Sequence, residues 1–154
     1  MKKVFAFVMA ACMAATVFVG CAPKEGEEEA ARVIKVGTSG PLTGGNAMYG
    51  NAVANGLKLA FEEINAQGGL QFEVNAQDDE GDTEKAVNAY TALMDWGMQI
   101  MAGPTTSGSA AATAAECAAD RVFMMTPSAS DVSVIAAGDN IFQICFTDPN
   151  QGIG

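Results

Sequence analysis

Residues 103–109 read Gly-Pro-Thr-Thr-Ser-Gly-Ser, and this stretch decides the fold. It follows a short apolar run typical of a buried strand, and it precedes an Ala-rich run at residues 110–119 that is typical of a helix. A strand that turns directly into a helix leaves free backbone N–H groups at the start of the helix. The helix dipole then favours an anion such as a carboxylate at that point. A second interpretation stays open, in which Thr105, Thr106 or Ser107 only caps the helix.

Strands and helices alternate along the chain on both sides of this stretch. The hydrophobic patterns predict strands at Val33–Thr38, Leu70–Ala76, Met98–Ala102, Val122–Met125 and Ile141–Phe146. They predict helices at Asn51–Ala66, Glu84–Trp96 and Ser107–Asp120, a short helix or turn at Asp131–Ala137, and a loop at Thr147–Gly154. This order predicts an α/β fold, with a mostly parallel sheet flanked by helices on both faces.

Three loops with small and polar residues leave the carboxyl ends of predicted strands. They are Ser39–Gly50, Gly103–Ser107 and Thr126–Ser130. Ligands of open parallel sheets bind at this edge. If the first, third and fourth strands are neighbours, the three loops converge and form a candidate binding site.

The composition excludes several classes of function. The chain has 154 residues, enough for one domain, and a net charge of -10. An acidic surface argues against nucleic acid as a partner, because phosphate binding needs clustered Lys and Arg. The absence of His removes the commonest general base and transition-metal ligand, and no Cys pair has zinc-like spacing. We therefore expect no metal and no cofactor.

Residues 1–20 have the layout of a bacterial signal peptide. Two lysines precede an apolar run at residues 4–19, which is short for a membrane span. Residues 18–21, Phe-Val-Gly-Cys, resemble a lipobox, in which Cys21 is lipidated and becomes the mature N-terminus. An ordinary signal cleaved elsewhere, with Cys21 incidental, is the alternative.

Residues 21–32 have the composition of a tether. They are rich in Glu and poor in apolar residues, and like charge keeps such a segment extended and disordered. The tether would join a lipid on Cys21 to a folded domain at residues 33–154.

A series of short motifs resembles one known family. In chain order they are Ser39–Pro41 with Tyr49–Gly50, Ile64–Ala66 with Gly68–Gly69, Asp78–Asp79, Gly103–Ser109, Pro127–Ser130 and Gln151–Gly152. In this order and spacing, residues 33–154 resemble the type 1 periplasmic binding proteins of branched-chain amino acid ABC transporters. The resemblance implies the Rossmann-like first lobe of a two-lobed solute-binding protein, incomplete here, and not an enzyme.

The resemblance also assigns roles to residues of the three loops. It places Ser107, with Thr106 in the same turn, where a hydroxyl and backbone N–H groups hold the α-carboxylate of the ligand. The backbone carbonyl of Ser128 would receive the α-ammonium group, and the hydroxyl and backbone of Ser130 would hold ligand polar groups. Tyr49 would line the pocket beside an aliphatic side chain. As alternatives, Tyr49 packs on its own lobe, and the two serines form only a turn before a cap at Asp131.

The partners and location follow from the same resemblance. It implies an exported protein, anchored to the bacterial cell membrane by lipid and facing the periplasm or cell exterior. Such a protein delivers an amino acid, here expected to be aliphatic, to the membrane permease of an ABC transporter. A sensor domain of the same fold for amino acids or small amides is the alternative. A nucleotide-using enzyme is a third reading, but residues 37–45 match no phosphate-binding Gly motif.

Two features depart from the family pattern. The positions of a disulfide found in the leucine-specific type hold no Cys here, while Cys117 and Cys145 either pair with each other or stay free. Family members are also more than twice as long, and this sequence stops near the first crossing to the second lobe. We therefore expect residues 21–154 alone to bind ligand weakly or not at all and to be marginally stable, with an open apolar sheet edge.

Overall fold

The computed structural model describes residues 32–153. Its strands are β1 (Val33–Gly40), β2 (Gln71–Asp78), β3 (Ile100–Met101), β4 (Phe123–Thr126) and β5 (Ile141–Gln143). Its helices are α2 (Ala47–Ala66), α3 (Thr83–Trp96), α4 (Ser107–Asp120), the 3-10 turn η1 (Ile135–Ala137) and α5 (Asp148–Gln151). The predicted signal segment, with Cys21 and almost all of the tether, lies outside the described residues. None of the helices in the described part is long and apolar enough to cross a membrane.

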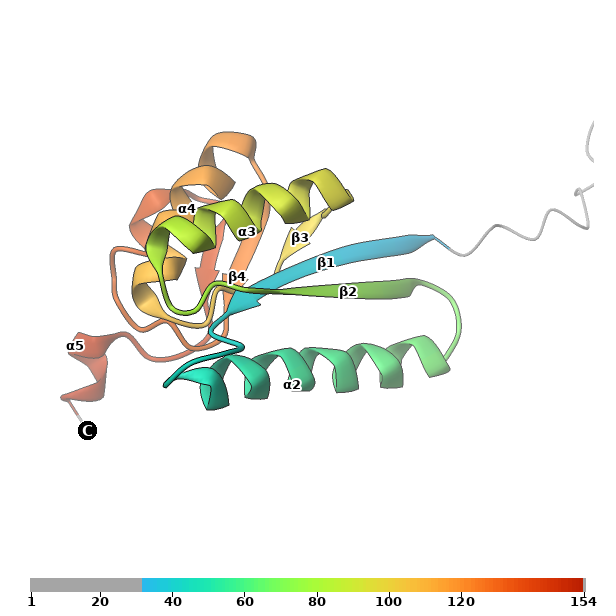
Figure 1. Cartoon of the computed structure of the whole chain (residues 1–154), viewed down its shortest axis with the longest axis horizontal. Helices are drawn as coiled ribbons and strands as arrows, with labels where there is room; N and C mark the ends of the chain where they lie inside the picture. The colour runs from blue at the N-terminus through green and yellow to red at the C-terminus, as the bar shows by residue number, and fades with distance from the viewer. Residues whose placement is uncertain (1–31, 154) are drawn as a thin grey trace, which may run out of the picture. The chain divides into compact units, whose positions relative to one another are not determined.

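The five strands form one sheet in the order β2-β1-β3-β4-β5, and every pair is parallel. Helix α2 covers one face of β1 and β2, whereas α3 and α4 lie together on the opposite face (Figure 1). The predicted α/β fold with helices on both faces is confirmed. Strands β1, β3 and β4 are neighbours, so the three polar loops leave the same edge of the sheet.

Local signals set the ends of α3. The Asp82 carboxylate accepts hydrogen bonds from the backbone N–H groups of Glu84 and Lys85, both at 2.9 Å. It therefore caps the first turn. The helix ends at Gly97, whose φ of 92° lies in the left-handed region that glycine adopts without strain.

The main core lies between the sheet and the α3–α4 face. Leu93 of α3, Met101 of β3 and Met124 of β4 are fully buried there. On β1, Gly37 allows α3 to approach closely, since a Cβ at this position would lie 3.0 Å from Leu93 Cδ1 and 2.2 Å from Met98 Sδ. A larger residue at position 37 would push the helix or the Met98 side chain away from the strand.

The opposite face of β4 and β5 is more open. Met124 and Ile141 belong to the core, so the alternation of side chains places their neighbours Phe123 and Phe142 on the other face. These two rings stack with centroids 5.2 Å apart and remain 39% and 44% exposed. The pair thus forms an apolar surface patch beyond the area that α2 covers.

Several element boundaries differ from the predicted ones. β1 and β2 each run two residues further, to Gly40 and Asp78, because the parallel pair stays in register over their whole length. Within the segment predicted as a loop at 147–154, residues 148–151 form the helix α5 instead, so that prediction is wrong there. Its first N–H, on Asp148, donates to the Ser130 carbonyl at 2.9 Å, a contact between distant segments.

The structure also resolves the cysteine alternative. Cys117 is buried on α4, Cys145 is half-buried after β5, and both are free thiols. Burial raises the pKa of the Cys117 thiol to about 12.

The core makes a direct prediction for stability. Leu93→Ala should lower the free energy of unfolding by about 2–5 kcal/mol, because it opens a cavity between α3 and β1. Urea unfolding followed by circular dichroism measures the change. The control is Leu59→Ala on the exposed side of α2, which should cost less than about 0.5 kcal/mol. Equal losses in the two variants would contradict the described core.

Candidate functional site

The turn between β3 and α4 is fastened to the end of β1. The Ala102 N–H donates to the Gly37 carbonyl at 2.8 Å, and the Thr105 N–H donates to the Ser39 carbonyl at 3.1 Å. At Gly103, with φ of 153°, a Cβ would meet Thr38 Oγ1 at 2.9 Å, so the turn is too close to β1 for a side chain. The start of α4 is therefore held directly at the carboxyl end of the central strand.

No hydroxyl of the turn caps α4. The Thr106 side chain, at the N-cap position, makes no capping hydrogen bond, and its buried Oγ1 has no partner among the described residues. Thr105 Oγ1 lies 3.4 Å from the Ser39 carbonyl instead. The interpretation of this stretch as a simple cap is wrong. The N–H groups of the first turn of α4 are left without a capping side chain and can face an anion.

Ser107 links α4 to the loop after β4. Its Oγ accepts hydrogen bonds from the backbone N–H groups of Ser130 at 3.1 Å and Asp131 at 3.4 Å. Because these donors occupy the acceptor side of the hydroxyl, its own proton is left to donate. A carboxylate oxygen at the helix start would accept that proton.

The loop after β4 contributes the other two predicted serines. Ser128 Oγ donates to the Thr105 carbonyl at 2.6 Å. Ser130 uses its N–H toward Ser107 and its carbonyl toward Asp148, so its hydroxyl is the group left for a ligand. Asp131 accepts from the Ser133 N–H at 2.7 Å, which forms the turn that the alternative interpretation expects.

The structure thus brings four of the five predicted ligand residues together: Thr106, Ser107, Ser128 and Ser130. Tyr49 stands apart from this hydrogen-bonded group. It lies in the first turn of α2 and is 59% exposed.

The end of β2 adds two carboxylates with opposite behaviour. Asp78 accepts hydrogen bonds from the Leu42 and Glu80 N–H groups and the Thr43 hydroxyl, and the Thr43 bond most of all lowers the pKa of Asp78. Asp79 is fully buried, and burial raises its pKa. Asp78 therefore orders the loop after β1, while Asp79 lies beneath it.

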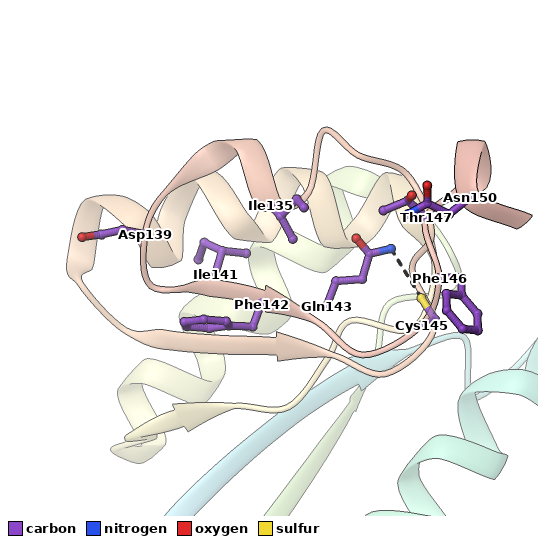
Figure 2. A pocket seen from close by; sticks show the side chains of 9 residues that line it. All are labelled: Ile135, Asp139, Ile141, Phe142, Gln143, Cys145, Phe146, Thr147 and Asn150. Atoms are coloured by element: carbon purple, nitrogen blue, oxygen red, sulfur yellow. Dashed lines mark hydrogen bonds between the residues drawn. The ribbon is translucent and has the colours of Figure 1, made fainter.

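A separate hollow of about 500 Å³ lies beside β5 and α5 (Figure 2). Its lining includes Ile141, Phe142, Phe146 and the Gln143 side chain, whose amide nitrogen contacts Cys145 Sγ at 3.4 Å. None of the five predicted ligand residues lines it. The candidate site is thus the hydrogen-bonded edge of the sheet and not this hollow.

Comparison with known proteins tests the resemblance directly. A family model described as "Periplasmic binding protein" matches residues 33–153. The chain belongs to the periplasmic binding protein family. The resemblance inferred from the motifs is confirmed.

Several relatives within the periplasmic binding protein family are named for branched-chain amino acids. The Leu/Ile/Val-binding protein BraC3 of Rhizobium johnstonii is 34% identical over 122 residues, which cover 77% of this chain and 33% of the relative. The leucine-, isoleucine-, valine-, threonine- and alanine-binding protein of Pseudomonas aeruginosa is 32% identical over 127 residues, with coverages of 80% and 34%. The chain spans about a third of the length of the curated relatives it matches.

Solved structures of the family contain a part with the same architecture. The branched-chain amino acid substrate-binding protein LivJ of Streptococcus pneumoniae, in complex with isoleucine, matches with a TM-score of 0.71 and 34% identity, covering 76% of this chain and 35% of LivJ. The leucine-binding protein LivK of Thermotoga maritima matches with a TM-score of 0.71 and 27% identity, covering 77% and 34%. Residues 32–153 therefore have the architecture of one part of these binding proteins.

Sequence reasoning assigned no role to Thr126 and treated Thr105 only as a candidate helix cap, but both residues connect the site. Thr126 Oγ1 donates to the Pro104 carbonyl at 2.7 Å and accepts from the Ala129 N–H at 3.2 Å. Thr105 bonds β1 through its N–H and Ser128 through its carbonyl. The sequence signal that could have identified these two residues is their position just after, or at the end of, a predicted strand.

The two carboxylates predict a pH dependence. The pKa of Asp78 is lower in the folded chain than its ordinary value of 3.8, so its stabilising effect is complete above that pH and is lost as the pH falls through the folded pKa. Asp78→Asn should lower the free energy of unfolding at neutral pH, and its difference from the wild type should narrow below about pH 4. Urea unfolding at several pH values measures this, with the exposed Asp95→Asn as control. A difference that stays constant down to pH 3 would contradict the assignment.

Proposed function

We propose that the chain is a solute-binding protein, or part of one, that captures a branched-chain or related amino acid for an ABC transporter. The observation that carries this proposal is the start of α4, where no side chain caps the free N–H groups. Beside them, Ser107 Oγ already accepts two hydrogen bonds, so its proton is free to bind an anion. Family membership and relatives named for leucine, isoleucine and valine support the same ligand class.

The geometry suits the carboxylate end of an amino acid. The first-turn N–H groups and the helix dipole attract negative charge, and the Ser107 hydroxyl adds a charge-assisted hydrogen bond. The neighbouring hydroxyl of Ser130 offers a further polar contact, whereas Thr106 Oγ1 is buried and contributes through its place in the turn. Binding requires no bond making or breaking, so the proposed role is capture and not catalysis.

The ammonium end of the ligand would meet the loop after β4. The Ser128 carbonyl accepts no hydrogen bond from residues 32–153, which leaves it open to a cationic donor. Tyr49 presents an exposed side chain on α2, which would cover the aliphatic side chain of the ligand. Closure of a second lobe over this wall would bury both charged ends of the ligand with their hydrogen bonds satisfied.

The ligand contacts predict the effect of a single substitution. In the complete gene product, Ser107→Ala should weaken binding of the best amino acid ligand about 10- to 100-fold, because one hydrogen bond to a charged group is lost. Isothermal titration calorimetry with leucine, isoleucine and valine measures the dissociation constant. Ser133→Ala, an exposed serine that is not one of the predicted ligand residues, is the matched control. Unchanged affinity in Ser107→Ala would remove Ser107 from the site.

We also propose that the protein is exported and anchored by lipid on Cys21, with residues 1–20 removed and residues 21–32 as the tether to the folded part. Delivery to the membrane permease then takes place at the outer surface of the membrane. The family supports export, and the lipobox-like residues support the anchor.

Lipidation has its own test. Cys21→Ser should abolish incorporation of a labelled fatty acid into the protein in bacterial cells and move it from the membrane to the soluble fraction. Cys12→Ser, within the apolar run of the signal, should leave labelling unchanged. Labelling that survives in Cys21→Ser would exclude the anchor.

A further inference from the structure

Asp79 is an unusual residue for the inside of a small domain. Among the described residues, it is the charged member of the set of fully buried polar side chains, with 0% exposure. Removing a carboxylate from water is costly unless donors replace the water. The groups that contact Asp79 therefore show which donors replace the water around its carboxyl group.

Three segments surround the Asp79 carboxyl group. Ser39 Oγ at the end of β1 donates to one oxygen at 3.1 Å, and the Gly81 N–H in the loop before α3 donates to the other at 2.8 Å. Ser109, in the first turn of α4, is the third neighbour. Its buried Oγ completes no hydrogen bond, yet it lies close enough to lower the pKa of Asp79. The carboxyl group thus lies against the same helix turn that begins with Ser107.

The charges around Asp79 do not compensate it. The charged group that acts on it is the neighbouring Asp78 carboxylate, which also opposes its ionisation. In the described part of the chain, Lys85 pairs with Glu80 and Arg121 with Asp139, both at the surface. The facing residues on β1 and α4 are the neutral Ser39 and Ser109. An ionised Asp79 is therefore stabilised by neutral donors, which are the Gly81 N–H, the Ser39 hydroxyl and the neighbouring Ser109 hydroxyl in the first turn of α4.

We propose that the Asp79 carboxyl group sets the affinity of the α4 N-terminus for a carboxylate ligand, because its ionised form places a second negative charge beside the turn that holds the ligand. This inference rests on the proposed function. It makes Asp79 an affinity-determining residue that need not touch the ligand.

The interaction is a repulsion between two anions at one helix start. In a partly buried site such a repulsion is far stronger than in water, and salt screens it little. By linkage, a ligand that binds more weakly when Asp79 is ionised must also raise the pKa of Asp79. Binding should therefore take up protons in the pH range where Asp79 titrates.

A purely structural role for the charge has a different signature. A structural carboxylate stabilises the fold more when it is ionised. Burial of Asp79 raises its pKa above the ordinary value of 3.8, so its ionisation costs stability as the pH rises from 3.8 through the folded pKa. Asp79→Asn, which keeps the shape and removes the charge, should therefore fold and be at least as stable as the wild type at alkaline pH.

The test compares leucine binding by the wild type, Asp79→Asn and the surface control Asp95→Asn, all as complete gene products. Calorimetry from pH 4 to pH 8.5 gives the affinity, and buffers of different ionisation enthalpy give the proton uptake. Asp79→Asn should bind roughly three- to tenfold more tightly at the alkaline end, with the advantage shrinking toward acidic pH and persisting at high salt. The wild type and the control should take up protons on binding, whereas Asp79→Asn should not.

Each outcome has one meaning. If the wild type binds none of the amino acids, the proposed function fails and this inference fails with it. If the wild type binds leucine but Asp79→Asn binds it equally or more weakly over the whole range, only the inference is overturned. If Asp79→Asn does not fold, the wild type alone tests the inference. Leucine binding without proton uptake at any pH would then overturn it.

Discussion

The candidate site depends on the hydrogen bond from the Thr105 N–H to the Ser39 carbonyl. That 3.1 Å contact joins the end of the central strand β1 to the turn that starts α4. The Thr105 carbonyl then receives the Ser128 hydroxyl, and Ser107 receives the Ser130 N–H. One backbone contact therefore sets the start of α4, and side-chain contacts from the same turn set the loop after β4. A parallel sheet makes this possible because it brings the ends of β1, β3 and β4 to one edge.

The sequence predicted those features that local chemistry determines. The α4 bounds, Ser107–Asp120, agree with the predicted ones, since the Ala-rich run is a strong helix former. The Asp82 cap also depends on local chemistry, since its carboxylate bonds the N–H groups two and three residues further on. The family resemblance followed from motifs spread over the whole domain and is confirmed.

Other features depend on contacts between distant segments, which the sequence pattern does not reveal. The hydroxyls of residues 105–107 looked like helix caps, but Thr105 and Ser107 are used by β1 and by the loop after β4. Helix α5 was missed because a four-residue helix has no periodicity to detect, and its first N–H bonds the distant Ser130. Asp79 was visible only as half of an acidic pair, and its burial depends on β1, the following loop and α4 together.

The two free thiols have a practical consequence for spectroscopy. Cys117 is buried, and burial raises the pKa of its thiol, so it reacts poorly with alkylating reagents. Cys145 is half-buried, and its Sγ donates to the Ala129 carbonyl at 3.2 Å, inside the loop that carries Ser128 and Ser130. Among residues 32–153, a thiol-directed fluorophore would thus attach at a single native position next to the candidate site. Its emission would report motion of this loop without any engineered cysteine.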